Sequence, residues 1–295
     1  MLRFAPSPTG PLHLGHAFSL LLNDRMARLL GRPFTIRLED IDQTRARPAH
    51  EAAILEAIDW LGIVWQRPMR RQSAHFADYA TALARLEALG VLTTSYATRR
   101  EIAHACRTGA PRDPDGAPLF PGDALVIGEP EAARRRDTNA PHTIRLNMQR
   151  ALSLTGPLTM ERVDETGAPL APCPVAPAAW GDVVLARKDA PTSYHLSVTV
   201  DDALQGITHV VRGADLHAAT AIHRVLQTLL DLPAPAYHHH ALILADDGKK
   251  LSKSDGATSL LALKEAGATP QTIASTLEST TGHPLPKRAT PPAGA

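Results

Sequence analysis

The chain has 295 residues, 44% hydrophobic and 21% charged, enough to build the buried cores of about two domains. Its 31 Lys and Arg residues almost balance its 30 Asp and Glu residues, so the net charge of +1 neither indicates nor excludes a nucleic-acid partner. Two cysteines, Cys106 and Cys173, are too few for a disulfide framework, and no apolar run approaches the ~20 residues that span a bilayer. We therefore expect a cytoplasmic protein with no signal peptide and no membrane partner.

The N-terminal part of the chain is predicted to alternate strands and helices. Short apolar runs indicate strands at residues 2–5 and 34–38. Apolar residues recur with helical spacing at residues 14–30, 51–61 and 81–90. Because a strand, a helix and a second strand follow one another so closely, the two strands are expected to pair in parallel.

A segment rich in Pro, Gly and charge, residues 93–136, is predicted to be a loosely structured insertion. A helix is expected at residues 215–230, and from Ala266 the Thr-, Pro- and Ala-rich chain is expected to fray. Predicted strands in this part of the chain cover residues 143–146, 181–187, 193–201, 208–212 and 240–244.

These elements predict an α/β fold: a doubly wound parallel sheet of the Rossmann type with an inserted subdomain and a short helical C-terminal piece. Residues 1–90 are expected to form the first half of the sheet domain, 91–178 the insertion, 179–245 the second half, and 246–295 a loop and short tail. Ligands bind such sheets beyond the carboxyl ends of the strands, where the loop after residues 2–5 is expected to lie.

The first motif, His13-Leu14-Gly15-His16, lies where this loop becomes a helix. Backbone N–H groups at a helix N-terminus attract phosphate, and two imidazoles three residues apart lie on one side of the first turn. Gly15 allows a flat ring to approach the backbone. The motif therefore favours a nucleotide site, although capping and packing histidines would give the same four residues.

A second motif, Lys250-Leu251-Ser252-Lys253-Ser254, follows the last predicted strand. The ammonium groups of Lys250 and Lys253 can close over a triphosphate and neutralise the charge that develops as pyrophosphate leaves. Taken alone, the motif is more typical of a solvated charged turn. Its meaning therefore depends on the first motif.

In this order, on a parallel-sheet pattern, the two motifs resemble the HIGH and KMSKS motifs of class I aminoacyl-tRNA synthetases. Three further stretches are similar to the glutamyl branch of that family: RFAPSPTG at residues 3–10, RLEDID at 37–42 and GITHVVRGADL at 206–216. The resemblance implies an ATP-dependent ligase in which L-glutamate and ATP share one pocket. Mg²⁺ would accompany ATP through the phosphates, with few protein ligands.

The resemblance also implies roles for residues on the glutamate side. Free glutamate carries two carboxylates and one ammonium, so Arg3 and Arg212 are candidate carboxylate partners and Glu39 is a candidate partner for the ammonium. Ser7 and Tyr194 would supply neutral hydrogen bonds. Alternatively, the charged residues form surface ion pairs, which contribute little to stability.

On the ATP side, His13, Gly15 and His16 would hold the nucleotide, and His13, His16, Lys250 and Lys253 are the expected catalytic residues. The implied chemistry is attack of a glutamate carboxylate oxygen on the α-phosphorus of ATP, which gives glutamyl-adenylate and pyrophosphate. A hydroxyl of a bound RNA then attacks the mixed anhydride. The protein contributes positioning and charge stabilisation rather than a covalent nucleophile.

We expect the stretch after Ser254 to be too short for the helical domains with which a full glutamyl-tRNA synthetase reads the anticodon. The chain therefore resembles the truncated paralogues of that enzyme. The resemblance implies transfer of glutamate to the queuosine base at the wobble position of tRNA(Asp). We expect a monomer with L-glutamate, ATP and tRNA(Asp) as partners.

Three alternatives remain open. The chain can be a minimal glutamyl-tRNA synthetase that charges the 3′ end of tRNA(Glu). It can be a small-molecule nucleotidyltransferase with an HxGH motif, although RLEDID and VVRGADL would then be unexplained. It can also be a catalytically silent module that binds RNA or an amino acid, an alternative that the intact His13, His16 and Lys253 disfavour.

Many members of the family hold a structural zinc ion in the insertion, bound by C-x-C and a later Y-x-x-x-C. The matching positions here are Ser95, Ala97, Phe120 and Ala124, none of which is a zinc ligand, and Cys106 falls outside the pattern. We therefore predict that no zinc is bound.

Two further stretches depart from what a ligand site would require. The run His238-His239-His240 does not indicate a metal, because consecutive strand residues point to alternate faces and cannot converge on one ion. After Asp215, four positions at which we expect more polar residues are occupied by Ala219, Ala221, Ile222 and His223. The residues that complete the ATP side of the pocket are therefore not defined by the sequence.

Overall fold

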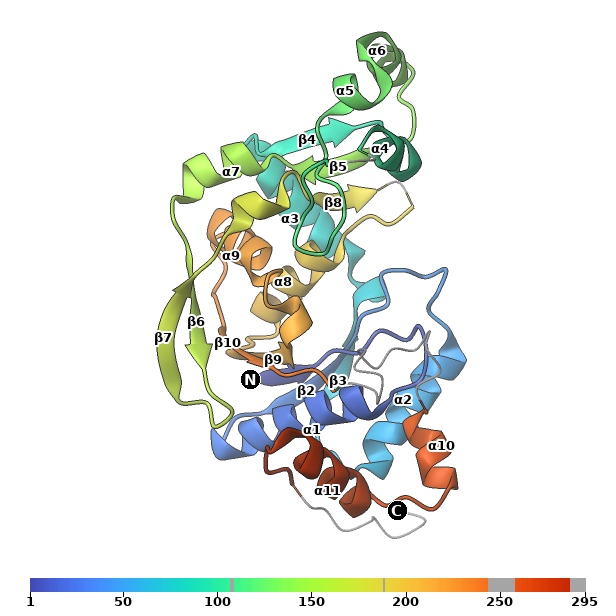
Figure 1. Ribbon diagram of the computed structural model, residues 1–295, viewed down its shortest axis with the longest axis vertical. Coiled ribbons are helices and arrows are strands. Elements are labelled where there is room, and N and C mark those ends of the chain that lie inside the picture. The colour runs from blue at the N-terminus through green and yellow to red at the C-terminus, as the bar shows by residue number, and fades with distance from the viewer. Residues whose placement is uncertain (107–108, 188, 244–257, 287–295) are drawn as a thin grey trace.

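The computed structural model describes residues 1–106, 109–187, 189–243 and 258–286 (Figure 1). Lys250 and Lys253 lie outside these ranges, so their role stays a prediction from sequence. Within the described part of the chain, no helix is long and apolar enough to cross a bilayer.

The first half of the fold is a three-stranded parallel sheet with helices between its strands. Strands β1 (Leu2–Phe4), β2 (Phe34–Leu38) and β3 (Gln66–Arg71) alternate with helices α1 (Leu14–Leu29), α2 (Pro48–Trp60) and α3 (Phe76–Ala88). Every residue of β1 and β2 is buried, as is typical of a parallel sheet covered on both faces. The predicted strand–helix–strand unit is confirmed. The sequence pattern misses β3, because QRPMRR is polar and largely exposed.

A four-stranded sheet lies on the other side of β1. Its order is β7-β6-β10-β9, built from β6 (Thr159–Val163), β7 (Pro169–Pro174), β9 (His209–Gly213) and β10 (Ala236–His240). Strand β10 runs parallel to both β6 and β9. Strand β1 lies against β9, where the N–H of Thr208 donates to the carbonyl oxygen of Met1 at 2.9 Å. Strand order therefore reverses between β1 and β9, as the predicted doubly wound α/β fold requires.

One predicted strand is wrong. Residues 193–201 alternate like a strand, but they belong to helix α8 (Tyr194–Leu204), which Ser193 caps by accepting a hydrogen bond from the N–H of Leu196 at 3.3 Å. Every side chain from residue 196 to 202 is buried, so the helix lacks the polar stripe that would reveal its period.

The boundaries of two later elements also differ from the prediction. The strand expected at residues 240–244 lies earlier in the chain, as β10, and ends at His240. The sequence does not indicate it there, because three of its residues are consecutive histidines although the strand is paired on both edges. The expected helix at residues 215–230 is divided into a 3-10 turn at Ala214–Leu216 and helix α9 (Thr220–Leu229). The predicted strand at residues 208–212 is confirmed as β9.

Two short helices, α10 (Leu260–Glu265) and α11 (Pro270–Thr281), form the predicted helical C-terminal piece. The expected fraying from Ala266 is wrong over α11. This helix has Pro270 in its first turn, and its cap Thr269 accepts a hydrogen bond from the N–H of Thr272 at 3.2 Å. It packs against α1 in the same core as β1 and β2, with three buried side chains: Ile273, Ala274 and Leu277.

Part of the predicted insertion, residues 91–178, lies on an antiparallel sheet of β4 (Leu92–Ser95), β5 (Thr143–Leu146) and β8 (Val184–Arg187), of which β8 follows the predicted end of the insertion. The expected loose structure at residues 93–136 is wrong in part, because three helices lie there: α4 (Arg99–Ala105), α5 (Asp123–Ile127) and α6 (Glu129–Asp137). Thr98 and Glu101 form a capping box that starts α4. Helix α7 (Met148–Thr155) follows β5 and packs against α9.

One carboxylate, Asp123, joins two of the four positions matched to the zinc pattern, Ser95 and Ala97. Asp123 accepts hydrogen bonds from the Ser95 hydroxyl at 3.2 Å and from the N–H groups of Tyr96 and Ala97 at 2.7 and 2.9 Å. Behind this loop, buried Ala97 and partly buried Phe120 belong to one small apolar cluster. Among the described residues, no group of His, Cys, Asp and Glu side chains could hold a metal ion.

We predict that Asp123→Ala lowers the free energy of unfolding by about 1–3 kcal/mol, because it leaves three partly buried donors without their acceptor. Urea unfolding followed by circular dichroism measures the change. The matched control is Asp113→Ala, since Asp113 also accepts two backbone N–H bonds but lies in an exposed loop. Equal destabilisation by the two variants would contradict a special role for Asp123.

Candidate functional site

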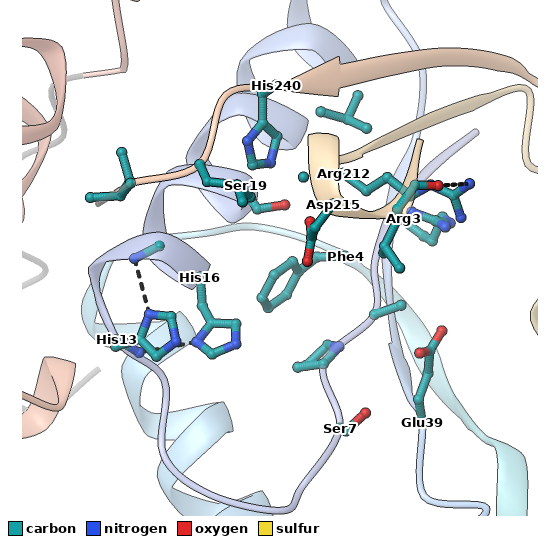
Figure 2. A pocket seen from close by; sticks show the side chains of 18 of the residues that line it. Arg3, Phe4, Ser7, His13, His16, Ser19, Glu39, Arg212, Asp215 and His240 are labelled. Carbon is teal, nitrogen blue, oxygen red and sulfur yellow. Dashed lines mark hydrogen bonds between the residues drawn. The ribbon is translucent and has the colours of Figure 1, made fainter. Parts of the chain in front are cut away.

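A pocket of about 760 Å³ opens beyond the carboxyl ends of β1 and β9, where strand order reverses. Figure 2 shows His13 and His16 on one side of it and Arg3 and Arg212 on the other. All predicted site residues within the described chain line this pocket: Arg3, Ser7, His13, Gly15, His16, Glu39, Tyr194 and Arg212. The two predicted lysines, Lys250 and Lys253, lie outside the described residues.

The first turn of α1 fixes both histidine rings of the HLGH motif. Nδ1 of His13 accepts a hydrogen bond from the N–H of Gly15 at 3.1 Å, and Nδ1 of His16 accepts one from the N–H of His13 at 3.2 Å. A ring that accepts at Nδ1 carries its proton on Nε2 when neutral and donates through that atom. A side chain at position 15 would meet the His13 ring at 3.1 Å, so Gly15 makes room for this packing.

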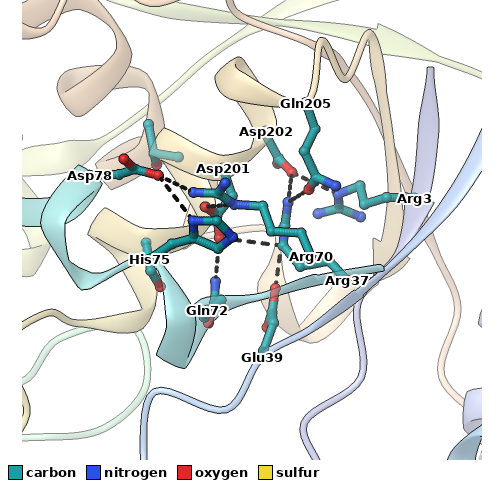
Figure 3. A network of polar contacts seen from close by, with 12 residues as sticks. Arg3, Arg37, Glu39, Arg70, Gln72, His75, Asp78, Asp201, Asp202 and Gln205 are labelled. Atoms are coloured by element: carbon teal, nitrogen blue, oxygen red, sulfur yellow. Dashed lines mark hydrogen bonds and ion pairs between the residues drawn. The ribbon is translucent and has the colours of Figure 1, made fainter. Parts of the chain in front are cut away.

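Two of the three charged residues on the glutamate side, Arg3 and Glu39, are joined by a buried ionic chain (Figure 3). Nε of Arg3 donates to Oδ1 of Asp202 at 3.0 Å, and the same oxygen accepts from Arg37 at 2.7 Å. Arg37 also donates to Oε1 of Glu39 at 3.2 Å. Arg37 has no exposed surface, and the side chains of Arg3 and Asp202 are less than one-tenth exposed. The expected alternative of surface ion pairs is therefore wrong for these residues.

A second carboxylate, Asp201, fixes α8 to the first half of the fold. It accepts hydrogen bonds from Arg70 of β3 at 2.7 Å, from Gln72 at 2.8 Å and from the Tyr79 hydroxyl of α3 at 2.9 Å. Asp201 is fully buried, so these donors replace the water it has lost. Asp201 and Asp202 together hold α8, and hence Tyr194 in its first turn, against the strands that carry Arg3 and Glu39.

Burial and ion pairing together determine which carboxyl groups of this ionic chain are ionised. Burial raises the pKa of Glu39, although Arg37 and Arg3 oppose the effect. Burial would also raise the pKa of Asp202, but Arg3 and Arg37 outweigh it and lower that pKa. Asp202 is therefore the ionised partner of both arginines, whereas Glu39 would gain from a further cation in the pocket.

Arg212 has a different environment from Arg3. Its guanidinium donates to the Thr220 hydroxyl at 2.8 Å, to the carbonyl oxygen of Leu216 at 3.1 Å, and to Nδ1 of His223 and Nε2 of His239, both at 3.3 Å. Within the described chain, Arg212 forms no ion pair. These four acceptors are neutral groups, as is the Tyr194 hydroxyl, which accepts a fifth hydrogen bond from Arg212 at 3.5 Å, so the positive charge of Arg212 is oriented but not neutralised.

Two histidines, His223 and His239, contact this arginine, and His195 contacts His223; we refer to the three as the histidine cage. Burial, and then the charge of Arg212, lowers the pKa of His195 to about 4 and that of His239 to about 2. The pKa of His223 is lowered well below its usual range for the same two reasons. The cage is thus uncharged at neutral pH.

The sequence gives little sign of these supporting groups. Arg37 stands in an apolar strand and Asp201-Asp202 in an apolar segment, and charges in such places signal buried pairing. The cage residue His223 belongs to the run of unexpected residues after Asp215. None of these residues lines the pocket; His223 lies behind Arg212, and Ala219, Ala221 and Ile222 pack in the core.

The three consecutive histidines of β10 have separate partners. Nδ1 of His238 lies 3.1 Å from the carbonyl oxygen of Val163, and Nδ1 of His240 lies 2.9 Å from that of Ala241. His239 alone reaches Arg212. The rings therefore occupy different surroundings, as the alternation along a strand predicts.

Comparison with known proteins matches residues 1–284 to a family described as tRNA synthetases class I (E and Q), catalytic domain. The chain is 46% identical to the Glutamyl-Q tRNA(Asp) synthetase of Rhodobacter capsulatus, over 92% of this chain and 97% of that protein. It is 38% identical to the Glutamyl-Q tRNA(Asp) synthetase of Nocardia farcinica, over 96% and 85% of the two chains. Glutamate--tRNA ligase 2 of a Methylobacterium species is also 38% identical, over 99% of this chain but 62% of the ligase.

Among solved structures, the glutamate-tRNA synthetase of Elizabethkingia anophelis superposes with a TM-score of 0.67 at 28% sequence identity. The match covers 86% of this chain and 52% of that chain, so this chain spans about half the length of that synthetase.

We predict that Arg37→Gln lowers the free energy of unfolding by about 3–5 kcal/mol, because it strips Asp202 and Glu39 of a buried counter-charge. Chemical unfolding measures the loss. Arg134→Gln serves as the control, since Arg134 pairs with Glu131 on the exposed face of α6 and should contribute little. If the two variants are equally stable, the buried chain does not hold the site together.

We also predict that the protein loses stability as the pH falls from about 6.5 towards 4. Unfolded His195 binds a proton near pH 6.5, whereas the folded state binds it only near pH 4, so acid favours the unfolded state in this window. His195→Gln should flatten this slope, and His104→Gln, on an exposed helix face, should not. Unfolding free energies at pH 7, 6 and 5 test it; identical slopes in all three proteins would contradict the assignment.

Proposed function

The chain belongs to the glutamate and glutamine family of class I tRNA synthetases, and from this premise we propose that it activates L-glutamate with ATP and transfers it to the queuosine base at the wobble position of tRNA(Asp). The observation that carries the proposal is the 46% identity to the Rhodobacter capsulatus Glutamyl-Q tRNA(Asp) synthetase across 97% of that protein. Action as a monomer in the cytoplasm, with Mg²⁺ bound through ATP and without zinc, is part of the proposal.

The pocket offers partners of the right sign for each charged group of glutamate. Arg3 and Arg212 would face the carboxylates, and Glu39 would face the ammonium, whose charge would lower the raised pKa of the Glu39 carboxyl. Ser7 and Tyr194 would donate or accept neutral hydrogen bonds. These roles agree with the positions of the five side chains around one cavity.

ATP would lie on the other side of the pocket. Nε2–H of His13 and of His16 would donate to phosphate oxygens beside the N-terminus of α1, with Gly15 close to the nucleotide. Lys250 and Lys253, assigned from sequence alone, would neutralise the leaving pyrophosphate. A glutamate carboxylate oxygen attacks the α-phosphorus, pyrophosphate leaves, and an RNA hydroxyl then displaces AMP from the adenylate.

The nearest alternative is a glutamyl-tRNA synthetase that charges the 3′ end of tRNA(Glu). It is supported by the 38% identity to the Methylobacterium Glutamate--tRNA ligase 2 over 99% of this chain. The same pocket would serve both reactions, because both begin with glutamyl-adenylate. The acceptor therefore decides between them.

We predict glutamate-dependent exchange of pyrophosphate into ATP without any tRNA, and transfer of radiolabelled glutamate to tRNA(Asp) only when the tRNA contains queuosine. Nuclease digestion should place the label in the anticodon fragment. The matched controls are tRNA(Asp) lacking queuosine and tRNA(Glu).

Two outcomes would contradict the proposal. Labelling of the 3′ end of tRNA(Glu), or an absolute tRNA requirement for exchange, would favour the alternative synthetase. Absence of exchange under all conditions would indicate a binding module without catalysis.

A further inference from the structure

The histidine cage joins four elements around one guanidinium. Arg212 lies on β9, and the cage residues come from α8 (His195), α9 (His223) and β10 (His239). His223 accepts from one terminal nitrogen of Arg212 and His239 from its Nε, each at 3.3 Å. Nε2 of His223 in turn lies 3.3 Å from Nδ1 of His195. The arginine therefore has fixed neighbours on the side away from the pocket.

The protonation of the cage follows from the donors of arginine. A guanidinium can only donate, so Nδ1 of His223 must accept and its ring proton must lie on Nε2. That proton then points to Nδ1 of His195, which accepts it and carries its own proton on Nε2. A second proton on His223 would place two donors face to face at 3.3 Å. Geometry and the lowered pKa of His223 agree that the ring is neutral.

Neutral acceptors distinguish Arg212 from Arg3. Asp202 supplies a negative charge directly to Arg3, and that oxygen is shared with Arg37. Arg212 lines the same pocket but has no carboxylate partner among the described residues. In a site with little water, an unneutralised guanidinium attracts an anionic group much more strongly than a neutral amide of the same shape.

We propose that His223 and His239 are positioning residues that orient Arg212 through neutral acceptors and thereby reserve its charge for the side-chain carboxylate of the substrate. The cage would thus set the preference for glutamate over glutamine, whose side chain differs by an amide in place of the carboxylate. This inference rests on the proposed function, since it assigns the specificity of the same pocket.

The test compares two nearly isosteric replacements of His223. In His223→Asn the amide oxygen takes the place of Nδ1 and stays neutral, whereas His223→Asp puts a negative charge on Arg212. We expect His223→Asp to raise the KM for glutamate at least tenfold and to lower the ratio of kcat/KM for glutamate to that for glutamine by a similar factor. The KM for ATP should not change. His223→Asn should keep the glutamate preference within about threefold, as the loss of one neutral bond implies.

Calorimetric titration of glutamate into each protein without ATP gives a second readout that does not need catalysis. Equal effects of Asn and Asp, or no effect of either, would overturn the inference, because a structural role would not respond to charge alone. A wild-type protein that binds glutamate but shows no exchange would overturn the proposed function and leave the binding comparison intact. Failure of the wild type to bind glutamate would overturn both.

Thermal unfolding of each variant checks that the fold is kept. Should His223→Asp fail to fold, the same comparison moves to His239. That ring accepts through Nε2, so the matched pair there is His239→Gln and His239→Glu. The expected signs are the same: the neutral variant keeps the preference for glutamate and the charged variant loses it.

Discussion

One oxygen of Asp202 accepts hydrogen bonds from two arginines, and the geometry of the pocket depends on it. Through this atom α8 holds Arg3 of β1 at 3.0 Å and Arg37 of β2 at 2.7 Å, and Arg37 reaches on to Glu39. The residues proposed to bind a carboxylate and the ammonium of glutamate, Arg3 and Glu39, are therefore spaced by one buried ionic chain. Taking these charges out of water is costly, so the arrangement is stable only because each charge meets an opposite one.

The two pocket arginines divide the work of recognition. Arg3 is neutralised by Asp202, so it supplies direction and hydrogen bonds more than net charge. Arg212 is held by a hydroxyl, a carbonyl and two imidazoles, so it keeps its charge. Glu39, at the far end of the buried chain, has a raised pKa and gains from a cation. A zwitterion with an acidic side chain matches this distribution of charge better than a neutral amino acid does.

Short sequence patterns predict those elements of the fold whose apolar period, loop and helix cap lie close together in the chain. The buried runs of β1 and β2 and the HLGH turn are visible because period, loop and cap lie within one short stretch. The sequence pattern of helix α8 is that of a strand because the helix is buried on nearly all sides. Glu39 is two positions from Arg37, but Asp202 is 165 positions from Arg37 and Asp201 is 131 positions from Arg70, so no window of sequence reveals the whole ionic chain. The histidine cage is hidden from local patterns for the same reason, because its three histidines lie on α8, α9 and β10 and the arginine that they hold lies on β9.

The insertion shows how one carboxylate can hold a loop where the family resemblance would place a zinc site. A structural zinc ion joins several ligands at one point, and its thiolate ligands cannot make that connection without the ion. A carboxylate can accept several hydrogen bonds at once, and Asp123 does so from Ser95 and the next two backbone N–H groups. Ala97 and Phe120, at two of the other matching positions, pack in an apolar cluster with Cys106. Hydrogen bonds to Asp123 and apolar packing therefore hold this loop together.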